Sequence, residues 1–461
     1  MRREAIATPG LYIFSMPTTA LIDEQRAAFA EDAPSLTVIP AHSANGKPGK
    51  IQRQLDDARE ALLAAGKSHA VIMITHDALM ADDFSGFTGW HARIDEAPNS
   101  LHTGRINIGN SREWYRNTFA LIPTPDGNWS VLQPLGAMPN WAQAQHDSLS
   151  GKLADFQKHA ARPHGVFVNL ADWDSGSAFD WFSIWTPLSL RNFASIQIAG
   201  ASYEISLGAL ATKKWFGDQM TLTQRVVPMA RTATPTIRVH YFTHGHEGTS
   251  TFWESSKGRL CIKLVCDHLE TRLTDDQAFW SGNKEVQHLM EHRVPGGPVA
   301  PKAAGLNIYR DKTVCAFIYS SKALPGDEPL YDLFDLTRAD VQRAREEEDI
   351  LQFVMRGAVR KPNFGGDYDI YVYSRLQAER VAEKLTASGV GTVELIALND
   401  AGIMDFTRED EVRVQPSAEG LTAKAAKRRA KDSDRVRKGR AKKALAEGRA
   451  PGRPGRPPTK R

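Results

Sequence analysis

Short apolar runs rich in β-branched residues recur along the chain, and polar residues directly follow several of them. In the first half such runs occupy residues 11–15, 71–75, 90–94 and 196–199. The runs at residues 11–15 and 71–75 are almost entirely apolar, which is typical of strands buried on both faces of a parallel sheet. After the first run come Pro17 and Thr18, and then Leu21, Ile22 and Gln25 at helical spacing. The alternation of strand and helix predicts an α/β fold.

One strand end carries residue types that bind magnesium and water. The segment WHARIDEAP, residues 90–98, ends a strand-like run in the carboxylate pair Asp95 and Glu96. At the carboxyl edge of a buried parallel strand an Asp can reach a magnesium ion and the next Glu can orient a water, which is the Walker B arrangement. An isolated Asp-Glu pair is more often a solvated surface pair, so the neighbouring segments decide its meaning.

Taken in order, the polar segments resemble the motifs of superfamily 2 helicases of the DEAD/DEAH type, including their phage and bacterial relatives. Motif Ia, the Thr-His strand end and motif II are matched by Pro17 and Thr18, by Thr75 and His76, and by Asp95 and Glu96. Motifs III, V and VI are matched by Gly200 to Ser202, by Gly305 and Asn307, and by Gln352, Arg356 and Arg360. The resemblance extends over most of residues 1–400.

The resemblance implies an ATP-dependent helicase or translocase acting on DNA, with RNA as an open alternative. Asp95 would hold the magnesium ion of ATP, Glu96 would activate water, and Arg356 or Arg360 would stabilise charge on the γ-phosphate. Gln352 would contact the nucleotide or support that arginine. The motif V residues would contribute to nucleotide binding, and the residues that would face the nucleic-acid backbone are Pro17, Thr18, Thr75, His76, Gly305 and Asn307.

Three motifs depart from the family pattern. Gly-Ala-Ser stands at residues 200–202 where the family usually has Ser-Ala-Thr, and Asn307 stands where Asp is common. Arg360 follows Arg356 by four residues, whereas the family's second arginine usually follows by three. The identity of the arginine finger therefore stays open between these two residues.

The phosphate cradle of such ATPases is missing from the sequence. A glycine-rich loop ending in Gly-Lys-Ser/Thr normally holds the phosphates at a helix N-terminus, but no G-x-x-x-x-G-K-S/T string occurs in the 461 residues. NGKPGK, residues 45–50, lacks the hydroxyl residue and is interpreted as a loop. We expect residues 1–7 to be the remainder of the cradle helix, with a P-loop segment encoded upstream. The alternative is a catalytically silent nucleic-acid-binding remnant.

The last residues form a basic tail. Residues 421–461 hold 16 lysines and arginines against 3 acidic residues, a net charge of +13, while the rest of the chain holds 42 against 51, a net of −9. The tail has almost no large apolar residues, so we expect it to be disordered. Its charge favours nucleic-acid binding over a mere solubility role. The arginines assigned to this binding are Arg428, Arg429, Arg453 and Arg456.

Length and composition fit two or three domains. We predict a first RecA-like parallel-sheet domain over residues 1–235, with an insertion at about residues 100–195. A second RecA-like domain is expected over residues 236–415 and the tail over 416–461. The insertion is rich in Trp, for which the core role is preferred over base stacking.

Cysteine and histidine usage limits the remaining possibilities. Cys261, Cys266 and Cys315 show no metal-ligand spacing, and no signal peptide is visible. We therefore expect a reduced, cytoplasmic protein. His240 and His244 lack a Cys partner or an HExxH helix, so no metal is expected beyond the magnesium of the nucleotide.

Overall fold

The computed structural model describes residues 1–42, 51–107, 112–124, 128–136, 153–175, 178–200, 203–225, 227, 230–245, 248–301, 308–322 and 327–406. The chain divides into two units, Met1–Asp405 and Phe406–Arg461. The description below concerns the first unit. None of its described helices is both long and apolar enough to cross a bilayer.

The first sheet has five parallel strands in the order β10-β4-β1-β3-β2. The strands are β1 (Leu11–Met16), β2 (Thr37–Pro40), β3 (Ala70–Thr75), β4 (His91–Asp95) and β10 (Ser195–Ala199). The four apolar runs of the first half therefore form strands as predicted, each within a residue or two of its expected bounds. Their carboxyl ends lie at one edge because every pair is parallel.

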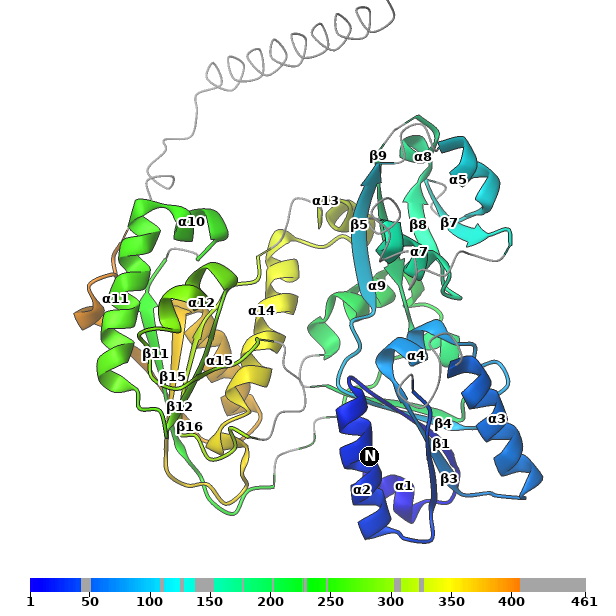
Figure 1. Ribbon diagram of the computed structural model, residues 1–461, viewed down its shortest axis with the longest axis horizontal. Coiled ribbons are helices and arrows are strands. Elements are labelled where there is room, and N and C mark those ends of the chain that lie inside the picture. Colours follow the sequence, from blue (N-terminus) through cyan, green and yellow to red (C-terminus); the bar gives the residue numbers. More distant parts are fainter. Residues whose placement is uncertain are drawn as a thin grey trace, which may run out of the picture. The chain divides into compact units, whose positions relative to one another are not determined.

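Helices cover both faces of this sheet (Figure 1). On one face, α1 (Arg2–Ala7) and α2 (Thr19–Asp32) pack against side chains such as Tyr12 and Phe14 of β1. On the other, α3 (Ile51–Ala64) and α4 (His76–Ala81) pack against Ile13 and its neighbours. Burial on both faces explains why β1 and β3 are almost entirely apolar rather than alternating.

A second, antiparallel sheet is inserted between β4 and β10, with strand order β5-β9-β8-β7-β6. Its strands are β5 (Leu101–Asn107), β6 (Phe119–Pro123), β7 (Trp129–Pro134), β8 (Val166–Asn169) and β9 (Ala178–Ile184). The helices α5 (Arg112–Thr118), α7 (Ala154–Ala160) and α8 (Leu170–Ser175) accompany them. Trp173 and Trp181 are buried in the core beneath this sheet, and Trp185 is buried in the first sheet's core, as the core interpretation predicted.

The other face of the antiparallel sheet is covered by two helices from distant parts of the chain. Both α9 (Leu207–Phe216) and α13 (Glu328–Phe334) pack on it. The ring of Phe182 lies 5.6 Å from that of Trp215 and 5.3 Å from that of Phe334. Trp215 Nε1 donates to the Leu333 carbonyl at 3.2 Å. We refer to the antiparallel sheet with its packed helices as the antiparallel domain.

The third sheet has six parallel strands in the order β13-β12-β14-β15-β11-β16. The strands are β11 (Thr236–Thr243), β12 (Ala278–Gly282), β13 (Gly297–Pro298), β14 (Val314–Ile318), β15 (Asp367–Ser374) and β16 (Thr392–Ala397). Its helices are α10 (Ser250–Glu254), α11 (Ser256–Arg272), α12 (Lys284–Met290), α14 (Arg338–Val354) and α15 (Arg375–Ala387). The core between the sheet and α14 and α15 includes Phe317, Phe353 and Val381. The predicted α/β class with parallel sheets is confirmed, whereas the domain boundaries at residues 235 and 415 stay a prediction.

A carboxylate cluster ties two central strands of the third sheet together. Asp369 on β15 accepts from Arg238 Nε and Nη2 of β11, both at 2.7 Å, and its Oδ1 lies 2.7 Å from His240 Nε2. Asp367 accepts from the same guanidinium at 2.9 Å but is exposed. Burial raises the pKa of Asp369, but the hydrogen bonds from Arg238 and His240 outweigh burial and hold this pKa below its ordinary value.

We expect Asp369→Asn to destabilise the fold at pH 7 by about 2 kcal/mol, because charge-assisted hydrogen bonds are lost. Because the pKa of Asp369 is lower in the folded protein, its ionised carboxylate stabilises the fold fully at pH values above the ordinary Asp pKa. This stabilisation is lost as the pH falls through the pKa that Asp369 has in the folded protein. The deficit should therefore shrink in acid. Denaturant titration between pH 7 and pH 2 measures it. The control Asp367→Asn should cost no more than about 1 kcal/mol, and equal losses for both variants would contradict this account.

Candidate functional site

Asp95 and Glu96 lie where β4 ends, one strand from the centre of the first sheet. Both side chains are half-buried. Burial raises the pKa of the Asp95 carboxyl, against the opposing charges of the Met1 amino group and Arg360. Burial and the Asp95 charge raise the pKa of Glu96, while Arg356 and Arg360 oppose the rise. Two adjacent acids and two arginines therefore interact electrostatically at this strand end.

The backbone of Glu96 is in the left-handed region, with φ of 67°. For a residue with a Cβ this conformation costs on the order of 1 kcal/mol or more, and such strain gathers at functional sites. Its N–H donates to the Ala199 carbonyl of β10 at 2.7 Å. The strand end is therefore held in a conformation that the sequence alone would disfavour.

His76 lies behind the carboxylates. It begins α4, is 8% exposed, and its Nε2 lies 3.0 Å from the Asp95 carbonyl oxygen. Burial lowers the pKa of His76 to about 4. Because a carbonyl only accepts, Nε2 of the neutral ring must donate. Contact between His76 and nucleic acid stays a prediction, and the observed partner of His76 is the backbone of Asp95.

The other polar strand ends serve as helix caps. Thr18, directly after Pro17, is the N-cap of α2, and its Oγ1 accepts from the Leu21 N–H at 3.2 Å. Thr75 is the N-cap of α4, and its Oγ1 accepts from the Ala78 N–H at 3.3 Å. Both threonines follow strands that pair with one another, so they share the sheet edge at which Asp95 lies. Their expected contact with nucleic acid is not tested by this geometry.

The motif VI residues come from α14 and the turn after it. Gln352 lies within α14 and donates to Glu348 at 3.4 Å. Arg356 follows the end of that helix, and Arg360 ends the 3₁₀ turn Ala358–Arg360. The charge of Arg356 acts on Glu96, and the exposed Arg360 acts on both acids. The fold thus brings the residues predicted as motif VI, which follow α14, near the acids at the end of β4.

Arg356 is a buried arginine whose charge acts on Glu96. It is 6% exposed, and its Nη1 is buried without a hydrogen-bond partner among the described residues. Burial lowers its pKa, while the charge of Glu96 acts in the opposite direction. A buried guanidinium with an unused donor is costly unless an anion completes it. Phosphate oxygens are suitable acceptors for such a donor.

One cradle-like tripeptide was missed by the sequence analysis. Gly66, Lys67 and Ser68 form a Gly-Lys-Ser string. The structure places it at the end of α3, where Gly66 has φ of 61° and its N–H donates to the Leu63 carbonyl at 3.0 Å. The string therefore closes a helix before β3, whereas a phosphate cradle leads from a strand into a helix.

Several expected site residues lie outside the described residues. They are Ala201, Ser202, Gly305, Asn307, Arg428, Arg429, Arg453 and Arg456, and the loop predicted at residues 45–50 also lies outside the described ranges. Gly200 is described, and lies exposed directly after β10. No group of three or more metal-binding side chains is assembled within the described ranges. Asp95 as a magnesium ligand stays a prediction.

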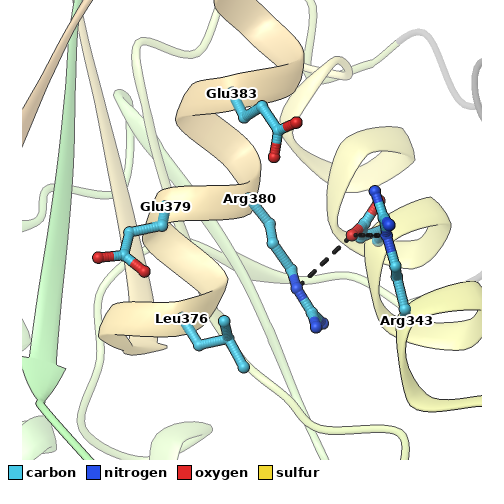
Figure 2. Close-up of a pocket in the computed structure, with 6 residues that line it drawn as sticks. Arg343, Leu376, Glu379, Arg380 and Glu383 are labelled. Atoms are coloured by element: carbon cyan, nitrogen blue, oxygen red, sulfur yellow. Dashed lines mark hydrogen bonds and ion pairs between the residues drawn. The ribbon is translucent and has the colours of Figure 1, made fainter. Parts of the chain in front are cut away.

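A pocket of about 340 Å³ lies between α14 and α15, away from the motif residues (Figure 2). Glu347 accepts there from Arg343 at 2.8 Å and pairs with Arg380 at 3.5 Å. Leu376, Glu379 and Glu383 complete its lining. Since two arginines already share one carboxylate oxygen, we treat the pocket as an ion-paired helix contact and keep the candidate site at the end of β4.

Comparison with known proteins finds matches among solved structures. No protein-family model matches the chain, and no curated protein matches it. Among solved structures, one titled "XPD_APO" aligns at 10% identity with a TM-score of 0.39, over 86% of this chain and 99% of the other. Another, "Structure of S. tokodaii Xpd4", aligns at 12% identity with a TM-score of 0.37, over 86% and 98%. The function therefore has to follow from the residues of this chain.

Arg356→Leu should leave the thermal stability of the protein unchanged or raise it, because it removes a buried donor that has no partner among the residues the structure describes. The matched control on the same segment is Arg345→Leu. Arg345 donates to the buried Asp327 at 2.7 and 2.9 Å, so its loss should cost about 3 kcal/mol. Chemical denaturation of both variants tests this. An equally large loss for Arg356→Leu would mean that Arg356 is a structural residue.

Proposed function

We propose that the chain is an ATP-dependent nucleic-acid helicase or translocase of superfamily 2. The observation that carries the proposal is the end of β4, where a strained Glu96 stands beside Asp95 under the charges of Arg356 and Arg360. These arginines follow α14, which packs on the third sheet, and a nucleotide site between two parallel sheets would be built in this way.

Each residue has a distinct role in this proposal. When bound, magnesium supplies positive charge that neutralises the phosphates, and Asp95 is the residue that would hold it. Glu96 orients the attacking water, and its raised pKa makes it a better proton acceptor. Arg356 or Arg360 stabilises charge on the γ-phosphate, and Gln352 supports the arginine from α14. Gly305 and Asn307 are proposed to contribute to nucleotide binding.

The proposed macromolecular partner is DNA, with RNA as the alternative. Pro17, Thr18 and Thr75 stand at the sheet edge after β1 and β3, where the backbone of a strand would pass. The tail adds a net charge of +13 over residues 421–461, which supports a polyanionic partner. The described cysteines are free and buried, in keeping with a proposed place in the cytoplasm.

The missing phosphate-cradle motif supports a second candidate function. The sequence holds no G-x-x-x-x-G-K-S/T string, and Gly66 to Ser68 close a helix instead. This observation favours a catalytically silent nucleic-acid-binding remnant. In the leading proposal, a separate P-loop-bearing segment supplies the cradle to the acids at β4.

The 461-residue chain should hydrolyse ATP slowly or not at all on its own, because no cradle positions the phosphates against Asp95. Phosphate release with and without DNA measures this, with Glu96→Gln as the control for contaminating activity. Restored, DNA-stimulated hydrolysis on addition of a P-loop segment, lost in Glu96→Gln by about a hundredfold, would support the enzyme. Hydrolysis by the chain alone that Glu96→Gln abolishes would show that phosphate is held by residues not identified here.

Deleting residues 421–461 should weaken binding to duplex DNA and flatten its salt dependence, because fewer counterions are released on binding. The melting temperature should hardly change, since we expect this segment to contribute no core. Fluorescence anisotropy of a labelled duplex across a salt series measures both affinity and slope. The same series with labelled RNA distinguishes the two nucleic acids. If the full and shortened chains showed the same salt dependence of DNA affinity, the DNA contact would have to be made by residues of the first unit.

A further inference from the structure

The peptide unit between Asp95 and Glu96 is held at both of its polar ends. Its carbonyl oxygen lies 3.0 Å from His76 Nε2, and its N–H donates to the Ala199 carbonyl at 2.7 Å. Rotating this peptide would break both hydrogen bonds and change the φ of Glu96. The two contacts therefore set the left-handed backbone of Glu96, which would otherwise relax.

Of the two contacts, the one from His76 comes from outside the two strands. His76 is the first residue of α4, and its ring also interacts with the backbone of Ser15 in β1. The ring is buried and has neutral character at physiological pH, so it acts as a hydrogen-bond donor without bringing a charge to the acids. Its position depends on how the first turn of α4 is placed.

The next residue, Asp77, is held by the antiparallel domain. Its carboxylate accepts from Arg162 Nη2 at 2.9 Å and from Lys158 Nζ at 3.2 Å. The side chain of Arg162 is only 2% exposed. Its other nitrogen, Nη1, lies 3.2 Å from Nδ1 of His159, and burial lowers the pKa of that histidine to about 2. A neutral His159 can accept a hydrogen bond but cannot balance the charge of the Arg162 guanidinium. Asp77 is the carboxylate that lies at hydrogen-bond distance from this guanidinium.

From these contacts we infer that His76 and Asp77 are positioning residues, through which the antiparallel domain sets the conformation of Glu96. Adjacent residues of one helical turn cannot move independently, so a displacement of Arg162 shifts Asp77 and with it the His76 ring. The hydrogen bond to the Asp95 carbonyl then tightens or breaks. The consequence for catalysis rests on the proposed function, because only there does Glu96 orient water.

Hydrogen exchange of the Glu96 amide reports this coupling directly, since that N–H is one of the two contacts. We expect Asp77→Asn and Arg162→Gln to speed its exchange by about tenfold, the effect of weakening one hydrogen bond. His76→Phe should do the same, and His76→Gln, which keeps a donor, should restore slow exchange. Amides of β11 and β15 in the third sheet should stay unchanged and so exclude global destabilisation.

Asp155→Asn is the matched control. Asp155 belongs to the same charged cluster, pairing with His159 at 3.6 Å, but it is exposed and sits on α7 rather than α4. Its replacement should leave the Glu96 amide unaffected. Because Asp77 is also exposed, its variant should fold even if His76→Phe does not. Unchanged Glu96 exchange in Asp77→Asn would overturn the inference. The measurement needs no nucleotide, so failure of the proposed hydrolysis would show separately in the Glu96→Gln assay.

Discussion

The parallel pairing of β1 with β3 and β4 is the interaction on which the candidate site depends. Met16 lies opposite Thr75, and Ser15 lies opposite Ile94. This register places the carboxyl ends of β1, β3 and β4 level with one another at one edge of the sheet. A shift by one residue would turn Asp95 to the opposite face of the sheet. The large apolar side chains that fix the register are therefore as necessary to the site as the acids themselves.

Asp369 and Asp327 are well-satisfied structural carboxylates, and the residues at the end of β4 contrast with them. Asp369 accepts two short hydrogen bonds from one arginine, and Arg345 makes two to Asp327. At the site, Glu96 is strained and Arg356 has an unused donor. Stability from well-packed sheets allows such residues to persist. Among the described residues, unpartnered buried atoms also occur elsewhere, at Arg93 and Ser281 for example, so the combination of backbone strain at Glu96 with the nearby charges marks the candidate site.

The sequence revealed those features that depend on local pattern. Continuous apolar runs predicted the parallel strands, and a carboxylate pair at a strand end predicted where the acids would lie. The role of His76 could not be predicted, because its partner is a backbone carbonyl that carries no sequence signal. The left-handed backbone of Glu96 could not be predicted either, because a position with positive φ is normally indicated by a glycine in the sequence. The tripeptide at Gly66 shows the reverse case, in which a motif is present but its structural context differs.

The packing of α13 on the antiparallel sheet has a consequence for synthesis of the protein. Trp215 bonds to Leu333, 118 residues further along the chain. During translation, the apolar face around Phe182 and Trp215 is complete in sequence long before its covering helix leaves the ribosome. Domains emerge in order and exposed apolar faces aggregate. The antiparallel domain therefore cannot finish folding until α13, and with it most strands of the third sheet, has been synthesised. Until then its apolar face would be exposed to chaperones.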